Sequence, residues 1–192
     1  MKAFRIAALT TVAAAALAFG AMTAAPSFAD DSPVTVGGAP MYSTKNIIQN
    51  AVNSKDHTTL VAAVKAAGLV ETLSGPGPFT VFAPTNEAFA QLPEGTVDTL
   101  LKPENKAKLV KILTYHVVAT NALSGAIAKM IKDDGGTHTI TTVSGGKLVA
   151  SMKDNKLMLE DENGGVAVVT IANVRQSNGV IHVVDHVLLP KS

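Results

Sequence analysis

The chain has 192 residues, of which 47% are hydrophobic, 16% charged and 4% aromatic, and its formal net charge is +1. So high a hydrophobic share with so little charge excludes a disordered chain, and a near-zero net charge gives no general attraction to nucleic acid. The sequence contains no cysteine, which excludes disulfides, thiolate metal sites, cysteine nucleophiles and a lipid attached to an N-terminal cysteine.

The first 29 residues have the three parts of a secretory signal peptide. A short basic start is followed by an uncharged, alanine-rich run over residues 6–19, and small residues lead to Ser27-Phe28-Ala29. A membrane anchor is the alternative, because residues 6–29 are uncharged and long enough to span a bilayer. Polar residues inside the run, and the lack of basic residues after it, favour a signal peptide. Cleavage after Ala29 would leave 163 residues with a net charge of −1, because Lys2 and Arg5 are removed.

Residues 30–45 show no sustained hydrophobic periodicity and contain two prolines and two glycines. Such residues punctuate secondary structure, so we predict a flexible lead over residues 30–45. One folded domain is then expected over residues 46–192, because the length suits a single domain and no internal repeat is visible.

Apolar residues at helical spacing predict several helices in the first half of this domain. Gly68 is the expected left-handed cap of the helix that contains Leu60, Val61 and Val64, and Thr85 is the expected N-cap of another. A further helix opens at Pro103, and its apolar stripe continues as far as His116. The sequence positions that support these helices are Ile47, Ile48, Val52, Leu60, Val61, Val64, Glu87, Glu104, Leu109, Ile112 and Leu113.

From residue 137 onward the pattern changes to short strands separated by glycine and asparagine turns. Helices come first and strands later, which predicts an α+β fold with antiparallel pairing among the strands. The strands are expected over residues 137–143, 147–152, 156–160, 166–174 and 180–189.

The search for catalytic and metal-binding motifs finds little. The chain has neither the glycine-flanked serine of a nucleophile elbow nor the glycine-lysine signature of a phosphate loop. His182 and His186 are four residues apart, but in a strand this separates them by about 13 Å, too far for one metal ion. Asp154, Asp161, Glu162 and Asn163 do not have the spacing of a calcium loop, and acidic hairpin turns are common. We therefore expect no metal or other cofactor.

Three polar residues have both a structural and a functional interpretation. Asp185 falls in the apolar row of the last strand, so we predict a buried carboxylate that accepts backbone N–H groups, with a catalytic acid or base as the alternative. His116 extends a helix stripe and is predicted to be partly buried, with ligand binding as the alternative. Tyr115 could either pack in the core or present its ring to a partner. Thr85 is expected to be a buried, structural cap.

Three segments resemble the conserved boxes of the fasciclin domain family. They are residues 79–89 (FTVFAPTNEAF), 113–118 (LTYHVV) and 178–190 (NGVIHVVDHVLLP), and the resemblance covers about residues 46–190. Their order and spacing also fit the family. One departure is Asn86, where the family often has aspartate.

The resemblance implies a wedge or sandwich of β-strands with several helices packed along it. It also implies a role in adhesion or matrix contact and no catalysis. In animal members the tyrosine-histidine region is linked to integrin binding, so Tyr115 and His116 are the candidate partner-contact residues by residue type. The short export signal and single-domain layout resemble a bacterial protein, in which an integrin partner need not exist.

The leading hypothesis is a secreted binding module, periplasmic or extracellular, that contacts a protein or polysaccharide of the cell surface, matrix or envelope. We expect a monomer that binds no nucleic acid and is not embedded in the membrane once the signal is removed. The alternative is a periplasmic small-molecule carrier or sensor with a pocket between the helices and the sheet. An enzyme is the third hypothesis and would require groups such as His116 and Asp185 to converge in a cleft.

Overall fold

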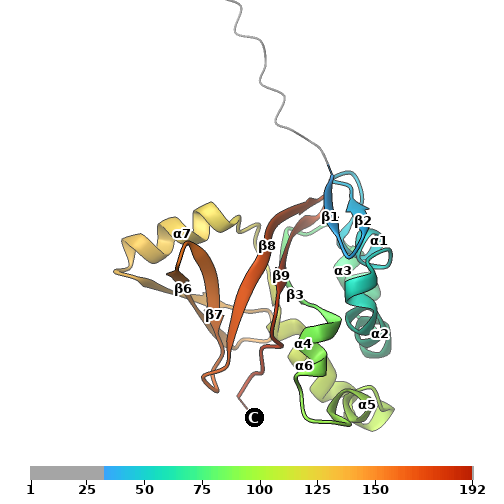
Figure 1. Ribbon diagram of the computed structural model, residues 1–192. Helices are drawn as coiled ribbons and strands as arrows, with labels where there is room; N and C mark the ends of the chain where they lie inside the picture. Colours follow the sequence, from blue (N-terminus) through green and yellow to red (C-terminus); the bar gives the residue numbers. More distant parts are fainter. Residues whose placement is uncertain (1–32, 192) are drawn as a thin grey trace, which may run out of the picture. The chain divides into compact units, whose positions relative to one another are not determined.

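A computed structural model describes residues 33–191, so the predicted signal peptide at residues 1–29 lies outside the described part of the chain. Within that part, helices are concentrated in the first half and strands in the second, and the α+β prediction is confirmed (Figure 1). The helices are α1 (Ile47–Ala51), α2 (Thr58–Ala67), α3 (Val70–Ser74), α4 (Asn86–Ala90), α5 (Thr96–Leu100), α6 (Lys106–Tyr115) and α7 (Ser124–Asp133). The strands are β1 (Val34–Val36), β2 (Ala39–Met41), β3 (Phe79–Pro84), β4 (Val117–Val118), β5 (Thr137–Thr141), β6 (Lys147–Lys153), β7 (Lys156–Glu160), β8 (Val166–Gln176) and β9 (Gly179–Val184).

Seven of the strands form one sheet in the order β4-β3-β9-β8-β7-β6-β5. Pairing is antiparallel from β5 through β9, as the tight turns predict, but β3 and β9 are parallel neighbours although about 100 residues separate them in the sequence. The three segments quoted above therefore lie side by side, because 113–118 leads into β4, 79–89 begins with β3 and 178–190 begins with β9.

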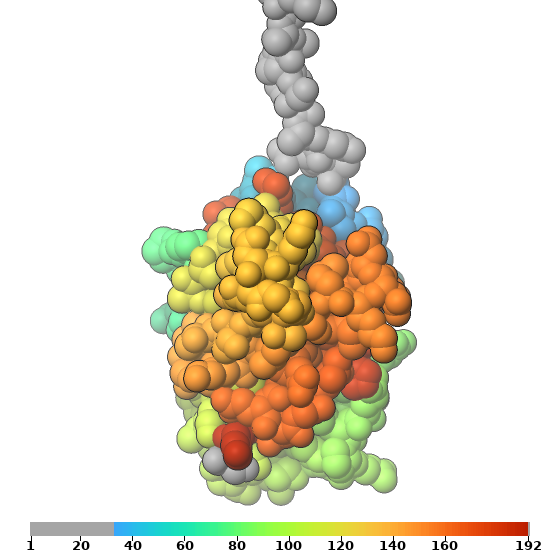
Figure 2. Space-filling model, turned by 90° about the vertical axis from the view of Figure 1, so that its left-hand side faces the viewer, coloured from blue at the N-terminus to red at the C-terminus, as the bar shows by residue number. Residues whose placement is uncertain are grey.

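Strands β3 and β9 separate two hydrophobic cores. Their side chains alternate between the faces of the sheet, so neighbouring residues such as Val81 and Phe82 belong to different cores. Helices α1–α6 cover one face, while α7 and strands β5–β8 enclose the other (Figure 1). In Figure 2, α7 faces the viewer at the upper centre of the molecule, beside the orange atoms of the β6–β7 hairpin. All six residues of β9 are buried, because this strand has a core on each side.

Local sequence signals place several helix ends correctly. Gly68 ends α2 in the left-handed conformation (φ 74°), and its N–H is bonded to the last turn of the helix. Thr85 caps α4, since its side chain accepts a hydrogen bond from the Ala88 N–H (3.2 Å). Thr85 is half-buried and not fully buried as predicted, because the N-cap lies where β3 leaves the sheet.

The predicted flexible lead at residues 30–45 is wrong for residues 34–41. Strands β1 and β2 pair antiparallel through the two-residue turn Gly37-Gly38, in which both glycines have positive φ, the conformation that a tight hairpin turn requires. Val36 and Met41 are buried in the helical-side core. The hairpin therefore belongs to the folded domain, which starts before the predicted boundary at residue 46.

The last predicted strand is also shorter than expected. β9 ends at Val184, whose register partner Pro84 is the last residue of β3. At Thr85 the neighbouring chain turns into α4, so a longer β9 would have no strand to pair with on that side. The residues after Val184 leave the sheet, and this changes the position of Asp185.

Candidate functional site

Four side chains from separate parts of the fold hold the C-terminal segment, residues 187–191, against the domain. They are Tyr115 and His116 at the end of α6, and Asp161 and Glu162 in the turn after β7. We call these four residues the C-terminal clamp. Each of them bonds to backbone groups, and three bond directly to the C-terminal segment.

His116 is 2% exposed and both of its ring nitrogens are occupied. Its Nδ1 bonds to the Ile112 carbonyl (2.9 Å), and Nε2 accepts the N–H of Leu188 (3.0 Å). This arrangement requires a neutral ring, with the proton on Nδ1. Burial lowers the pKa of His116 to about 4, because a charged ring in this position would have no contact with solvent. The ring is therefore a neutral structural link at physiological pH.

Asp161 is 7% exposed and accepts three backbone N–H groups. Oδ1 accepts from Asn163 and Gly165 (both 2.8 Å), which shapes the β7–β8 turn, and Oδ2 accepts from Leu189 (2.9 Å). A carboxylate with three such donors is well stabilised in a buried position. Both Asp161 oxygens therefore link backbone groups of the turn and of the C-terminal segment.

Tyr115 is fully buried, and its hydroxyl joins the clamp to the strands. The hydroxyl donates to the Lys147 carbonyl (2.6 Å) and accepts the N–H of Glu162 (3.2 Å). Burial raises the pKa of Tyr115 to about 12. Glu162 accepts the N–H groups of Lys191 and Lys147 (both 3.0 Å), and these bonds lower the pKa of its exposed carboxyl.

Tyr115 and His116 are therefore not surface contact residues, and the prediction that they touch a partner is wrong. Their side chains are sealed inside the molecule because the C-terminal segment and the β7–β8 turn close over the end of α6. In this chain Tyr115 bonds to the β7–β8 turn and His116 bonds to the C-terminal segment.

Replacing Tyr115 with phenylalanine is expected to lower the free energy of unfolding by about 1–2 kcal/mol, since a donor and an acceptor each lose a buried partner. Equilibrium urea denaturation followed by circular dichroism measures this change. A loss of binding without a loss of stability would show that the hydroxyl acts at the surface instead.

Asp185 is also placed differently from its prediction. Its side chain is 37% exposed, because β9 has ended, and it therefore does not lie in the apolar row of the strand. It does accept a backbone N–H, that of Val168 (2.7 Å), as expected of a structural carboxylate, and it pairs with His186 (2.8 Å). His116 and Asp185 thus bond to different partners, and they do not form the acid–base pair that an enzyme hypothesis would need.

The remaining buried histidines are likewise structural. His182 donates from Nε2 to the Ala122 carbonyl (2.9 Å) and stacks on Phe82 with ring centroids 5.7 Å apart. His57 bonds to Ser54 through Nδ1 (2.8 Å). Burial lowers the pKa of both rings. Among residues 33–191 no three acidic or histidine side chains are grouped so that they could hold a metal ion.

Asn86, the departure from the family pattern, has a role that aspartate could not fill. Its Oδ1 accepts from the N–H and the hydroxyl at the start of α2 (Thr59, 3.0 Å; Thr58, 3.1 Å). Its Nδ2 donates to the Lys55 carbonyl (2.8 Å), a bond that a carboxylate cannot make. The amide therefore fastens α4 to the first turn of α2.

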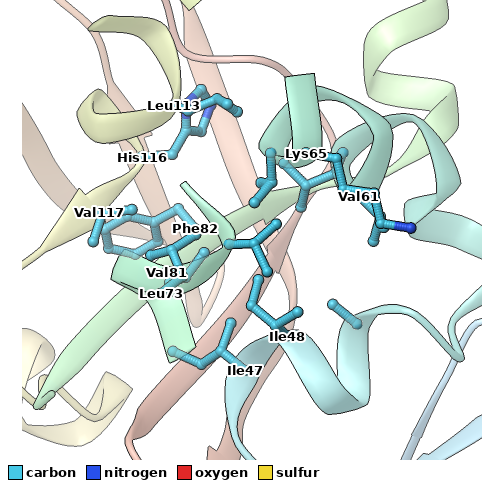
Figure 3. A pocket seen from close by; sticks show the side chains of 14 residues that line it. Ile47, Ile48, Val61, Lys65, Leu73, Val81, Phe82, Leu113, His116 and Val117 are labelled. Atoms are coloured by element: carbon cyan, nitrogen blue, oxygen red, sulfur yellow. The ribbon is translucent and has the colours of Figure 1, made fainter. Parts of the chain in front are cut away.

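An apolar pocket lies between helices α1–α3, the end of α6 and strand β3. Figure 3 shows Ile47 and Ile48 of α1, Val61 and Lys65 of α2, and Val81 converging on it. Its cavity volume is about 30 Å³, which is room for roughly one or two water molecules. A small-molecule ligand would therefore have to displace surrounding helices to enter.

Comparisons with known proteins find a matching domain family and several similar chains. The Fasciclin domain family profile matches residues 55–190. The chain is 45% identical to "Protein sll1483" of Synechocystis sp. over 98% of its own length and 97% of that protein. It is 33% identical to the "Cell surface glycolipoprotein MPB83" of Mycobacterium bovis, over 85% of this chain and 69% of that protein.

A solved structure has the same fold. It is described as a FAS1 domain pair from the insect cell adhesion molecule Fasciclin I, and it matches with a TM-score of 0.68 and 16% sequence identity. The match covers 76% of this chain and 51% of that one, as expected when one domain is compared with a pair. No helix among residues 33–191 is long and apolar enough to cross a membrane.

Proposed function

Because this chain belongs to the fasciclin domain family, we propose that it is an exported, non-catalytic adhesion module that contacts a protein or polysaccharide of the cell surface, matrix or envelope. The observation that carries the proposal is the shared fold with a domain pair from an insect cell adhesion molecule. A related protein of the same family is described as a cell-surface glycolipoprotein. The secretory pattern of residues 1–29 supports export.

The arrangement of titratable side chains supports a role without catalysis. Of the buried histidines, His116 and His182 bond to backbone groups through both ring nitrogens, and His57 bonds to the Ser54 hydroxyl through Nδ1 alone. General acid–base catalysis needs a group that reaches substrate with a pKa near the working pH. These rings are buried and their pKa values are lowered, so they suit packing instead.

Binding to isolated cell envelopes of the source organism tests the adhesion proposal. Fluorescently labelled purified protein should sediment with the envelopes, and unlabelled protein should compete for the same sites. Absence of saturable binding to both envelope protein and polysaccharide fractions would contradict the proposal.

A second function, a carrier of small apolar molecules, is favoured by the apolar pocket beneath α1 and α2. Native mass spectrometry of freshly purified protein would detect a co-purified ligand. Since the cavity is only about 30 Å³, such a ligand would be accompanied by movement of α1. A mass equal to that of the protein alone would count against this second function.

A further inference from the structure

An open groove runs between α5, α6 and the C-terminal segment. Its volume is about 680 Å³, within the range of sites that hold small ligands or short peptide segments. Leu100, Ile112, Leu189 and Pro190 contribute apolar side chains to it. In Figure 2 the C-terminal segment, in dark red, lies at the lower edge beside yellow-green atoms of α6.

The polar side of this groove is cationic. Lys108 and Lys111 lie three residues apart on α6 and therefore share a helix face, while Lys191 stands on the opposite wall. All three are exposed, no acidic residue is among the residues that line the groove, and within residues 33–191 none of the three forms an ion pair. Glu162 lies near Lys111 and Lys191 and accepts the N–H groups of Lys147 and Lys191, so three ammonium groups at the groove face one nearby carboxylate.

The wall formed by the C-terminal segment is fixed before any ligand arrives. Backbone N–H groups of Leu188, Leu189 and Lys191 bond to the C-terminal clamp. Asn163 donates to the Leu189 carbonyl (2.7 Å), and Lys111 Nζ donates to the Lys191 carbonyl (2.8 Å). A preformed groove costs little ordering entropy when it binds, which favours a specific site over a chance depression.

We propose that this groove binds an acidic peptide segment of a protein partner, with carboxylates on the lysines and an apolar side chain on the floor. The proposal rests on the adhesion function above and names the class of partner. Both groove walls carry ammonium groups, so a ligand with several carboxylates is more complementary than one with a single charged head. An acidic polysaccharide would place hydroxyl groups over Leu100 and Ile112, where they would lose hydration without gaining partners.

Fluorescence anisotropy with a labelled peptide, Glu-Asp-Leu-Leu-Asp-Glu, tests the proposal directly. The peptide should bind saturably to the purified protein, and more weakly as salt is added. Replacing its acids by amides, or its leucines by alanine, should each weaken binding by about tenfold, because the first removes the charges and the second removes the apolar contact.

Charge reversal in the protein locates the site. Lys108→Glu combined with Lys191→Glu should weaken peptide binding by about tenfold or more. The control is Lys153→Glu with Lys156→Glu, the same charge change on the exposed β6–β7 hairpin, which should change binding by less than about twofold. Lys111 is left unchanged because it bonds to the C-terminal segment. Thermal unfolding of both double variants should match that of the wild type.

Several outcomes would overturn the proposal. Equal loss of binding in the two double variants would show a general charge effect, and binding of polygalacturonate or dodecanoate without binding of the peptide would assign the groove to another ligand. If envelope binding survives Lys108→Glu with Lys191→Glu, the groove is not the binding site, and the adhesion function is still supported. Peptide binding to a protein that fails to bind envelopes would instead support the groove and contradict the adhesion function.

Discussion

The Asp161→Ala variant is expected to lose about 3–5 kcal/mol of the free energy of unfolding, because three backbone N–H groups lose a charged acceptor. Two of these donors form the β7–β8 turn and the third belongs to Leu189. The loss therefore affects both the turn and the attachment of the C-terminal segment. Urea denaturation followed by circular dichroism measures the change in stability.

Two variants calibrate this expectation. Asp185→Ala should cost only about 1 kcal/mol, because that carboxylate accepts a single backbone N–H and is partly solvated. Asp161→Asn keeps the shape of the side chain but has one acceptor oxygen in place of two, and should fall between wild type and Asp161→Ala. Equal losses at residues 161 and 185 would contradict the assignment of Asp161 as the structural carboxylate.

Stability is expected to fall steeply between pH 6.5 and pH 4. In this range the unfolded chain binds a proton at His116 that the folded chain does not, so lowering the pH favours unfolding. With a folded-state pKa of about 4, His116 alone accounts for about 3 kcal/mol, fully present above pH 6.5 and lost as the pH approaches 4. The lowered pKa values of His57 and His182 act in the same direction.

Urea denaturation at a series of pH values measures this dependence, and NMR titration of the histidine ring protons assigns it. His116→Gln should lower stability at pH 7 and flatten the slope below pH 6.5. A His116 ring that titrates near the ordinary histidine pKa of about 6.5 would refute the buried, neutral assignment.

Features set by neighbouring residues were predictable from the sequence, as the helix ends show. Gly68 and Thr85 act through bonds within four residues, and both cap the helices expected of them. The hairpin at residues 34–41 departs from the predicted flexible lead, because glycine and proline are typical of loops as well as of tight turns. The glycine pair instead supplies the two positive φ angles of a hairpin turn, and Pro40 is tolerated in a short edge strand.

Features set by distant residues were not predictable in the same way. Alternation along residues 180–189 gave no indication that the chain beside β9 turns into α4 at residue 85, which ends the strand. For that reason the sequence predicts a buried carboxylate at Asp185, which is 37% exposed, whereas the carboxylate that the fold buries is Asp161. Helix α7 was also missed, although Ile127 and Ile131 have helical spacing and are both buried.

The parallel pairing of β3 with β9 has a kinetic consequence. Strand β3 reaches its partner only when a segment about 100 residues later has been synthesised, and contacts of such long sequence separation slow folding because loop closure must come first. The β5–β8 hairpins can form locally, but the sheet between the two cores cannot close without residues 179–184. A nascent chain would therefore lack the central sheet, and the separation of its two cores, until its synthesis is almost complete.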